Sequence, residues 1–298
     1  MSKTEEIPED ILAVIEAPNE SLERKWNSLH GIDAYKHVVL SYMRDCLDKT
    51  RIESWCKKYY PDSRNLLTLL TFELGFSGKV VIFGDSGTGK TQFAEGLADA
   101  LAKIVGKVFL IKVGLMRSKY VGSSSLKVTK AFKYAREKAK EAPVLLFIEE
   151  FDSVAPNRDN SQMHEEVKAA VNTLLEEIDS ITPSDRVLVI AATNLLDQSV
   201  DFAAERRFDM VFNFKRPTFS QRLELLTILL KQFGIATEDL ILLSRKTSYY
   251  TQADIKKVLK HALNRCLSSN KRLTAKDIVD SLRFVAPTRS YNGGTDYE

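Results

Sequence analysis

An eight-residue loop in the first third of the chain has the residue types that bind a phosphate chain. It reads Gly84-Asp85-Ser86-Gly87-Thr88-Gly89-Lys90-Thr91 and lies between an apolar run and a helical pattern, which is the context such a loop requires. Its glycines let backbone N–H groups turn toward phosphate oxygens, and the following helix presents its positive end to them. Lys90 adds a charge at the β- and γ-phosphates, and the Thr91 hydroxyl is placed to ligate Mg²⁺. We predict a P-loop that binds and hydrolyses ATP with Mg²⁺; the alternative is an incidental glycine turn.

Two carboxylates, Glu149 and Glu150, directly follow the apolar run 144–148. An apolar strand that ends in two carboxylates suits a site for a metal ion and a water molecule. We predict that Glu149 belongs to the Mg²⁺ shell and that Glu150 polarises the attacking water. The alternative is a solvated acidic strand end, but the P-loop upstream favours the catalytic interpretation.

Three further polar residues stand beside predicted strands. Asn194 follows the run 189–193 and is our candidate to hydrogen-bond the water or the γ-phosphate, although an asparagine in a turn is common. Arg206 and Arg207 precede the run 210–214. They are either a solvated surface or arginine fingers inserted into a neighbouring subunit's site, where a finger raises the rate by on the order of 10³–10⁵. In the second case hydrolysis requires assembly.

Short apolar runs alternate with helical patterns through the middle of the chain. The runs that predict strands are 79–83, 108–113, 144–148, 186–192 and 210–214, and helical patterns separate most of them. Continuous apolar strands separated by helices predict a parallel sheet covered on both faces. The expected fold class is α/β, a P-loop five-stranded parallel sheet flanked by helices, with ligands at the carboxyl ends of the strands.

The flanking segments predict helices. Residues 1–24 are acidic and form a short amino-terminal segment with one helix over 9–16, and 32–58 has the spacing of one amphipathic helix. We place the α/β domain at 25–214, a small all-helical lid at 215–287 and a mobile tail at 288–298. The expected caps of the lid helices are Ser220, Thr251 with Asp254, and Thr274 with Asp277.

Composition excludes several classes. The chain has 298 residues, 44% of them hydrophobic and 28% charged, with a net charge of +3, an ordinary globular mixture without a basic stripe for nucleic acid. Three cysteines and four histidines show neither a disulfide framework nor metal-ligand spacing. We find neither a signal peptide nor a membrane span, and we expect a cytoplasmic protein.

Taken together, these motifs resemble the AAA family of ATPases, and more narrowly the group that includes katanin, spastin and the proteasomal ATPases. The resemblance covers about residues 25–287. The quoted segments are Lys25-Trp26-Asn27-Ser28-Leu29-His30-Gly31-Ile32, the P-loop, 147–158, Ala191-Ala192-Thr193-Asn194 and Tyr250-Thr251-Gln252-Ala253-Asp254-Ile255. In this family the first segment lies against adenine and the last lies in the lid. The resemblance therefore adds Gly31, Gln92 and Ala253 to the nucleotide-binding residues.

The resemblance also implies an assembly and a substrate. It implies a homo-hexameric ring with ATP at the subunit interfaces, Arg206 and Arg207 as paired fingers, and a protein substrate or adaptor. Lys119-Tyr120-Val121-Gly122 matches the first pore loop, in which an aromatic residue grips a polypeptide, so Tyr120 is the expected pore residue. Its alternative is a packed loop tyrosine. Residues 157–164 match a second pore loop.

The sequence departs from the family at four places. Asp85-Ser86 replaces two prolines of the P-loop, Glu149 stands where aspartate is usual, and Gln252 replaces a glycine of the lid. We expect no sizeable domain before Trp26, although in this family such a domain usually selects the substrate. Because Glu149 carries an extra methylene and Mg²⁺ tolerates poor geometry badly, we expect weakened Mg²⁺ handling or slower turnover.

Four functions remain open. The first is an ATP-driven remodeller that pulls a polypeptide through its pore. The second is an ATPase partner of a protease, faintly suggested by the penultimate Tyr297. The third is a nucleotide-gated scaffold with negligible hydrolysis. The fourth is a nucleic-acid motor, which the absence of a basic stripe disfavours.

Overall fold

The computed structural model describes residues 7–63, 65–70, 76–114, 124–149, 165–194 and 206–289. The chain divides into two compact units. The first holds most of the chain up to Phe212, and the second holds Leu29–Asp33, Gly84–Lys90 and the chain from Asn213 on. The P-loop thus groups with the helical unit, whereas the division from the sequence assigns it to the α/β domain. That division, at residues 24, 214 and 287, stays a prediction.

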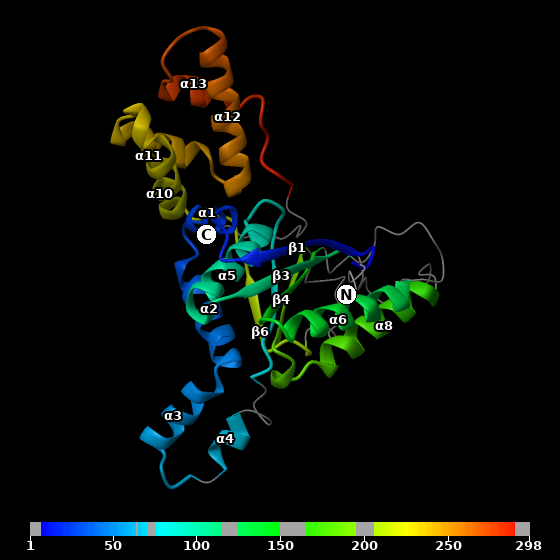
Figure 1. The fold of residues 1–298 in the computed structure, drawn as a ribbon. Helices are drawn as coiled ribbons and strands as arrows, with labels where there is room; N and C mark the ends of the chain where they lie inside the picture. The colour runs from blue at the N-terminus through cyan, green and yellow to red at the C-terminus, as the bar shows by residue number, and fades with distance from the viewer. Residues whose placement is uncertain are drawn as a thin grey trace. The chain divides into compact units, whose positions relative to one another are not determined.

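The first unit is built on one six-stranded sheet (Figure 1). The strands are β1 (Ile11–Ala17), β2 (Lys79–Phe83), β3 (Val108–Val113), β4 (Val144–Ile148), β5 (Val187–Thr193) and β6 (Met210–Asn213). They lie in the order β1-β3-β4-β5-β2-β6. β3, β4, β5 and β2 pair in parallel, and β4 and β5 are buried along their whole length. The expected α/β class, with a mainly parallel sheet, is confirmed.

The helix expected over residues 9–16 is wrong, and the sheet has six strands rather than five. Ile11–Ala17 forms β1, which pairs antiparallel with β3 so that Ala17 lies opposite Val108. This stretch is rich in β-branched residues, which suit a pleated surface, and the open edge of β3 offers unpaired backbone groups. Tertiary pairing therefore decided the conformation of a segment whose local pattern was ambiguous.

Helices cover the sheet, with α5 (Lys90–Val105) on the opposite side from α6 (Ser124–Ala139) and α8 (Glu165–Ser180) (Figure 1). Alternate strand residues such as Ile111, Leu146 and Val189 enter one buried cluster with apolar residues of α6 and α8. This alternation follows from the two-residue period of a strand. Both faces of the sheet are thereby removed from water, as the continuous apolar runs predicted.

The segment 32–58 forms two helices rather than one. These are α2 (Asp33–Leu47) and α3 (Lys49–Tyr59), preceded by α1 (Glu20–Asn27) and followed by the short α4 (Leu66–Thr68). Asp48 separates α2 from α3, and its carboxylate accepts a hydrogen bond from the backbone N–H of Thr50 at 3.1 Å. An aspartate that caps the next helix competes with continuation of the previous one.

The regular structure that follows Asn213 in the described residues is helical. The helices are α10 (Phe219–Leu230), η3 (Lys231–Phe233), α11 (Thr237–Lys246), α12 (Gln252–Ser268) and α13 (Ala275–Ser281). They share one apolar core, which includes Leu225, Leu243 and Val258. The all-helical character expected for the lid is confirmed.

Two of the three expected helix caps are confirmed. Thr251 with Asp254 and Thr274 with Asp277 form capping boxes at α12 and α13. The expected cap at Ser220 is wrong, because α10 begins one residue earlier and is capped by Thr218. None of the helices in the described residues combines the length and apolar character needed to cross a bilayer.

Candidate active site

The P-loop has a backbone path that side chains would obstruct. Gly84 and Gly87 have φ values of +142° and +86°, a region that residues with a Cβ rarely adopt. A Cβ on Gly84 would lie 2.3 Å from the carbonyl oxygen of Phe214, and a Cβ on Gly87 would lie 2.7 Å from Thr251 Oγ1. Only glycine fits at these two points. The loop therefore has the bare backbone that a phosphate chain requires for close approach.

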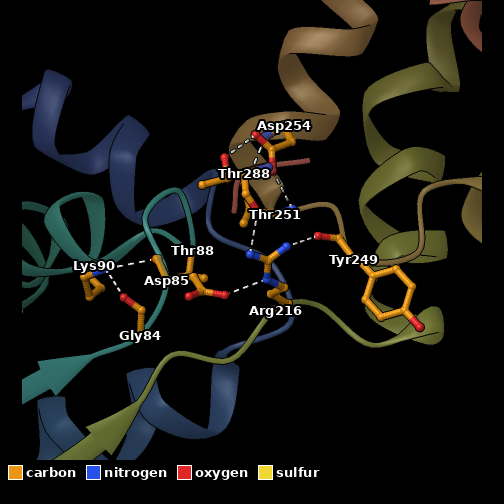
Figure 2. Close-up of polar contacts among 9 residues, drawn as sticks. All are labelled: Gly84, Asp85, Thr88, Lys90, Arg216, Tyr249, Thr251, Asp254 and Thr288. Atoms are coloured by element: carbon orange, nitrogen blue, oxygen red, sulfur yellow. Dashed lines mark hydrogen bonds and ion pairs between the residues drawn. The ribbon is translucent and has the colours of Figure 1, made fainter. Parts of the chain in front are cut away.

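Lys90 is buried and lies across the loop that it follows. Its ammonium group donates hydrogen bonds to the carbonyl oxygens of Gly84 at 2.6 Å and Asp85 at 3.0 Å (Figure 2). The Thr88 hydroxyl donates to the same Asp85 carbonyl at 2.9 Å. These bonds curl the loop, and α5 begins directly at Lys90. A curled loop, a lysine and a helix amino terminus together fit a polyphosphate.

The segment before the P-loop and the start of the lid meet the P-loop within the second unit. The backbone N–H of Ala253 donates to the Gly87 carbonyl at 3.2 Å. The Gln221 side chain donates to the Gly31 carbonyl at 2.5 Å, and the Gln252 side chain donates to the His30 carbonyl at 2.8 Å. Gln252, which stands where the family has glycine, therefore ties the lid to the segment expected to face adenine.

Gln92, which we predicted to bind nucleotide, has another contact in the structure. Its side-chain amide donates to the Lys25 carbonyl at 3.0 Å and to Ser28 Oγ at 2.5 Å. It thereby anchors the carboxyl end of α1 to α5. Ser86 and Thr91, by contrast, have exposed side chains.

The two predicted strand-end residues lie on neighbouring strands. Glu149 directly follows β4 and Asn194 directly follows β5. Ile148 is paired with Ala191, so Glu149 lies beside Ala192 and Asn194 lies two residues further on. β5 runs between β4 and β2, and the P-loop follows β2 in the chain. The sheet thus brings Glu149 and Asn194 to one edge, as parallel pairing requires.

Glu149 is not an isolated carboxylate. Lys112 on β3 places its ammonium nitrogen 3.1 Å from Glu149 Oε1 and 2.7 Å from Glu95 Oε1 on α5. Lys25 bonds the other oxygen of Glu95. Burial by itself would lower the pKa of Lys112, but hydrogen bonds and charge from Glu95 and Glu149 outweigh it and raise the pKa above 10.5. Lys112 therefore stays charged and competes with any cation for Glu149.

We expect the substitution Glu149→Asp to lower the Mg²⁺ concentration that half-saturates ATPase activity, by about two- to fivefold. The shorter side chain withdraws from Lys112, and a half-buried ion pair is worth up to about 1 kcal/mol. Lys112→Met should act in the same direction. Titration of steady-state turnover with Mg²⁺ checks this, with Glu149→Gln as the control that loses the charge. If the half-saturating Mg²⁺ concentration were unchanged in both Glu149→Asp and Lys112→Met, competition by Lys112 would be contradicted.

The structure separates the two predicted arginine fingers. Arg207 donates through Nε to Asp179 Oδ2 at 2.7 Å, so it is bonded within its own subunit. The Arg206 side chain is exposed, in the turn that precedes β6. Of the two arginines, Arg206 has the more exposed side chain. Glu150, Tyr120, Tyr297 and the segment 157–164 lie outside the described residues, and their roles stay predictions.

Sequence reasoning missed three residues that lie beside the predicted site: Lys112, Glu95 and Arg216. Lys112 is a charged residue inside the apolar run 108–113, which is a signal that a buried carboxylate lies nearby. Glu95 is a carboxylate on the buried face of α5. Arg216 stands just after the last strand, and the Asp85 of the P-loop, an acidic residue where phosphate should bind, predicts the need for such a cation.

Comparison with known proteins finds similar sequences over most of the chain. The model of the family described as "ATPase family associated with various cellular activities (AAA)" matches residues 80–216. CD-NTase-associated protein 6 of Escherichia coli strain MS 115-1 is 32% identical over 243 residues, which cover 76% of each protein. Proteasome-activating nucleotidase of Aeropyrum pernix is 34% identical over 224 residues, which cover 73% of this chain and 53% of that protein.

Two solved structures extend the likeness to the whole fold. A chain from the structure of the E. coli MS115-1 HORMA:CdnC:Trip13 complex superposes with a TM-score of 0.83 at 27% identity, covering 94% of this chain and 97% of that one. The FIGL-1 AAA domain in complex with ADP has a TM-score of 0.68 at 22% identity and covers 95% of this chain and 89% of that one. The second likeness shows the fold alone.

Proposed function

The chain belongs to the AAA family of ATPases, and from that premise we propose that it forms a ring that uses ATP hydrolysis to pull a protein partner through a central pore. The reaction itself is that of an ATPase, which converts ATP and water to ADP and phosphate. The ring, its six-fold number and the threading are the parts that we propose. They derive from the pore-loop match at Tyr120 and the finger match at Arg206.

We infer the arrangement for hydrolysis from the described residues and from the sequence prediction at Glu150. The bare P-loop backbone and Lys90 bind the phosphates, and Thr91 and Glu149 would hold Mg²⁺. When bound, Mg²⁺ supplies positive charge that offsets the charge developing on the phosphate oxygens. Glu150 accepts the proton of the attacking water, and Asn194 orients that water. Arg206 of a neighbouring subunit completes the site, so that turnover depends on assembly.

The observation that carries the proposal is the extent of the likeness to the E. coli structure. It spans nearly the whole chain, and so includes both the nucleotide-binding elements and the helical unit. That structure contains a HORMA protein and CdnC beside Trip13. We therefore infer a protein substrate for this chain, and a HORMA protein encoded in the same genome is the first partner to test.

The test is Tyr120→Ala. We expect remodelling of the HORMA protein, followed as a change in its protease sensitivity, to fall at least about tenfold, because an aromatic grip on a polypeptide is worth about 1.4 kcal/mol or more. ATP turnover should stay within about twofold, since Tyr120 lies outside the predicted hydrolysis residues. Tyr120→Phe, which retains the ring, is the matched control. Wild-type remodelling by Tyr120→Ala would contradict threading.

A second variant tests engagement of the partner. Glu150→Gln should bind ATP but not hydrolyse it, so it should retain the HORMA protein in Mg²⁺ and ATP and release it in ADP. Mass photometry of the same sample should show a hexamer. A chain that remained monomeric and yet hydrolysed ATP at full rate would contradict the ring.

The similarity to proteasome-activating nucleotidase favours a second candidate, an ATPase partner of a protease. The two candidates differ in the fate of the substrate. A remodeller returns the partner at full length, whereas a protease partner yields peptides when the protease is added. Absence of ATP turnover in the wild-type ring would instead support the scaffold.

A further inference from the structure

The P-loop carries a negative charge where a negative ligand must bind. Asp85 is the second residue of the loop, and its carbonyl already accepts the Lys90 ammonium group. The negative charge of this carboxylate repels a triphosphate bound at the loop, and a cation beside the carboxylate reduces that repulsion. A cation that offsets the charge of Asp85 therefore favours nucleotide binding.

Arg216 supplies that cation. Its Nε donates to Asp85 Oδ2 at 2.6 Å, and the two side chains are only 19% and 14% exposed. Because both partners are largely shielded from water, salt and solvent weaken this pair less than a surface ion pair. The pair also holds the carboxylate on the side of the loop away from the Lys90 ammonium, as Figure 2 shows.

The guanidinium group of Arg216 is held on all three nitrogens. One terminal nitrogen donates to the Tyr249 carbonyl and the other donates to the Thr288 carbonyl at 2.7 Å. The planar fork of an arginine is fixed in orientation when all its nitrogens are bonded. Arg216 is therefore a preorganised partner of Asp85 rather than a mobile surface cation.

Thr288, which accepts a hydrogen bond from Arg216, is itself connected to the P-loop through Asp254 and Thr251. The Asp254 carboxylate accepts hydrogen bonds from Thr288 N at 2.9 Å and from Thr288 Oγ1 at 2.7 Å. Burial would raise the pKa of Asp254, but these bonds and those from Thr251 outweigh it and lower the pKa below 3.8. Thr251 in turn lies against Gly87. A chain of contacts therefore runs from Asp85 through Arg216, Thr288 and Asp254 to Thr251 (Figure 2). Thr251 connects this chain to Gly87 in the middle of the loop.

We propose that Arg216 is a positioning residue for nucleotide binding that acts through Asp85, by neutralising this carboxylate and holding it aside from the phosphate-binding curl. The proposal rests on ATP binding at the P-loop and does not depend on threading of a partner. It predicts a particular dependence between two substitutions. Loss of Arg216 should be harmful only while Asp85 retains its charge.

The experiment is a double-mutant cycle on the full chain, read out as the affinity for a fluorescent ADP analogue. Arg216→Ala should weaken binding about tenfold, because it removes the guanidinium charge that offsets the Asp85 carboxylate in the phosphate-binding loop. The affinity of Asp85→Asn is the reference for the second side of the cycle. Adding Arg216→Ala to Asp85→Asn should change that reference affinity less than about threefold, since the repelling charge is gone.

Salt separates an electrostatic effect from a structural one. The defect of Arg216→Ala should shrink when ionic strength rises from about 0.05 M to about 0.5 M, because screening shortens the range of the repulsion. Thermal unfolding of each variant establishes that the compared chains are folded, and Arg216→Lys provides a variant that retains charge if Arg216→Ala does not fold.

Two results would overturn the inference. One is an equal loss of ADP affinity when Arg216→Ala is added to wild type and to Asp85→Asn, and the other is wild-type affinity in Arg216→Ala. Failure of the wild-type chain to bind ADP would overturn the inference together with nucleotide binding itself. Loss of partner remodelling in the presence of normal ADP binding would count only against the threading proposal.

Discussion

Lys90→Ala should lower ATP turnover per active site by at least about a hundredfold, because truncating one partner of a buried charge pair costs 2–5 kcal/mol or more. In the structure Lys90 is buried, and its ammonium group lies 2.6 Å from the Gly84 carbonyl. Nucleotide affinity should fall with turnover, since the charge is used in both the ground state and the transition state.

Two controls make this result specific to the site. Lys103→Ala removes a lysine from the same helix, one that pairs with Glu23 and Asp99, and should leave turnover within about twofold because neither partner belongs to the predicted site. Lys90→Arg retains the charge but not the compact ammonium group. Its ATP turnover should therefore lie between the turnover of Lys90→Ala and that of Lys103→Ala. Turnover by Lys90→Ala equal to that of Lys103→Ala would show that hydrolysis occurs elsewhere.

Arg206→Ala should lower turnover by on the order of 10³-fold while nucleotide affinity remains within about threefold, because an arginine finger stabilises charge in the transition state only. Arg207→Ala should have the smaller effect, since Arg207 is bonded to Asp179 of its own subunit. Single-turnover measurements on assembled protein check both values. The opposite ranking would show that the Asp179 contact is exchanged for one across the interface.

Mixing the two inactive variants tests whether the finger acts between subunits. In a mixed ring, a Lys90→Ala subunit supplies Arg206 to the intact P-loop of an Arg206→Ala neighbour, and about a quarter of head-to-tail interfaces have this arrangement at equal mixing. Turnover should therefore reappear in the mixture. Continued inactivity, with subunit exchange shown by fluorescence transfer between labelled subunits, would contradict a finger in trans.

Sequence reasoning succeeded where a signal is contained within one element. The glycines of the loop at 84–89, the apolar strands and the capping boxes at Thr251 and Thr274 all depend on residues a few positions apart. It failed at residues 9–16 and at Asp48, where a helical pattern was present. At the first, pairing with β3 decided the outcome, and at the second a cap did.

The amino-acid sequence by itself determined that a phosphate-binding loop stands between a buried strand and a helix, because those requirements are local. Only the tertiary structure decided which charges surround that loop and the carboxylates beyond it. Arg216 meets Asp85 across 131 positions, and Lys112 meets Glu149 because β3 pairs with β4. Such pairs depend on strand order and on the path of the lid. A charge in the sequence therefore predicts that a partner exists but not which residue it is.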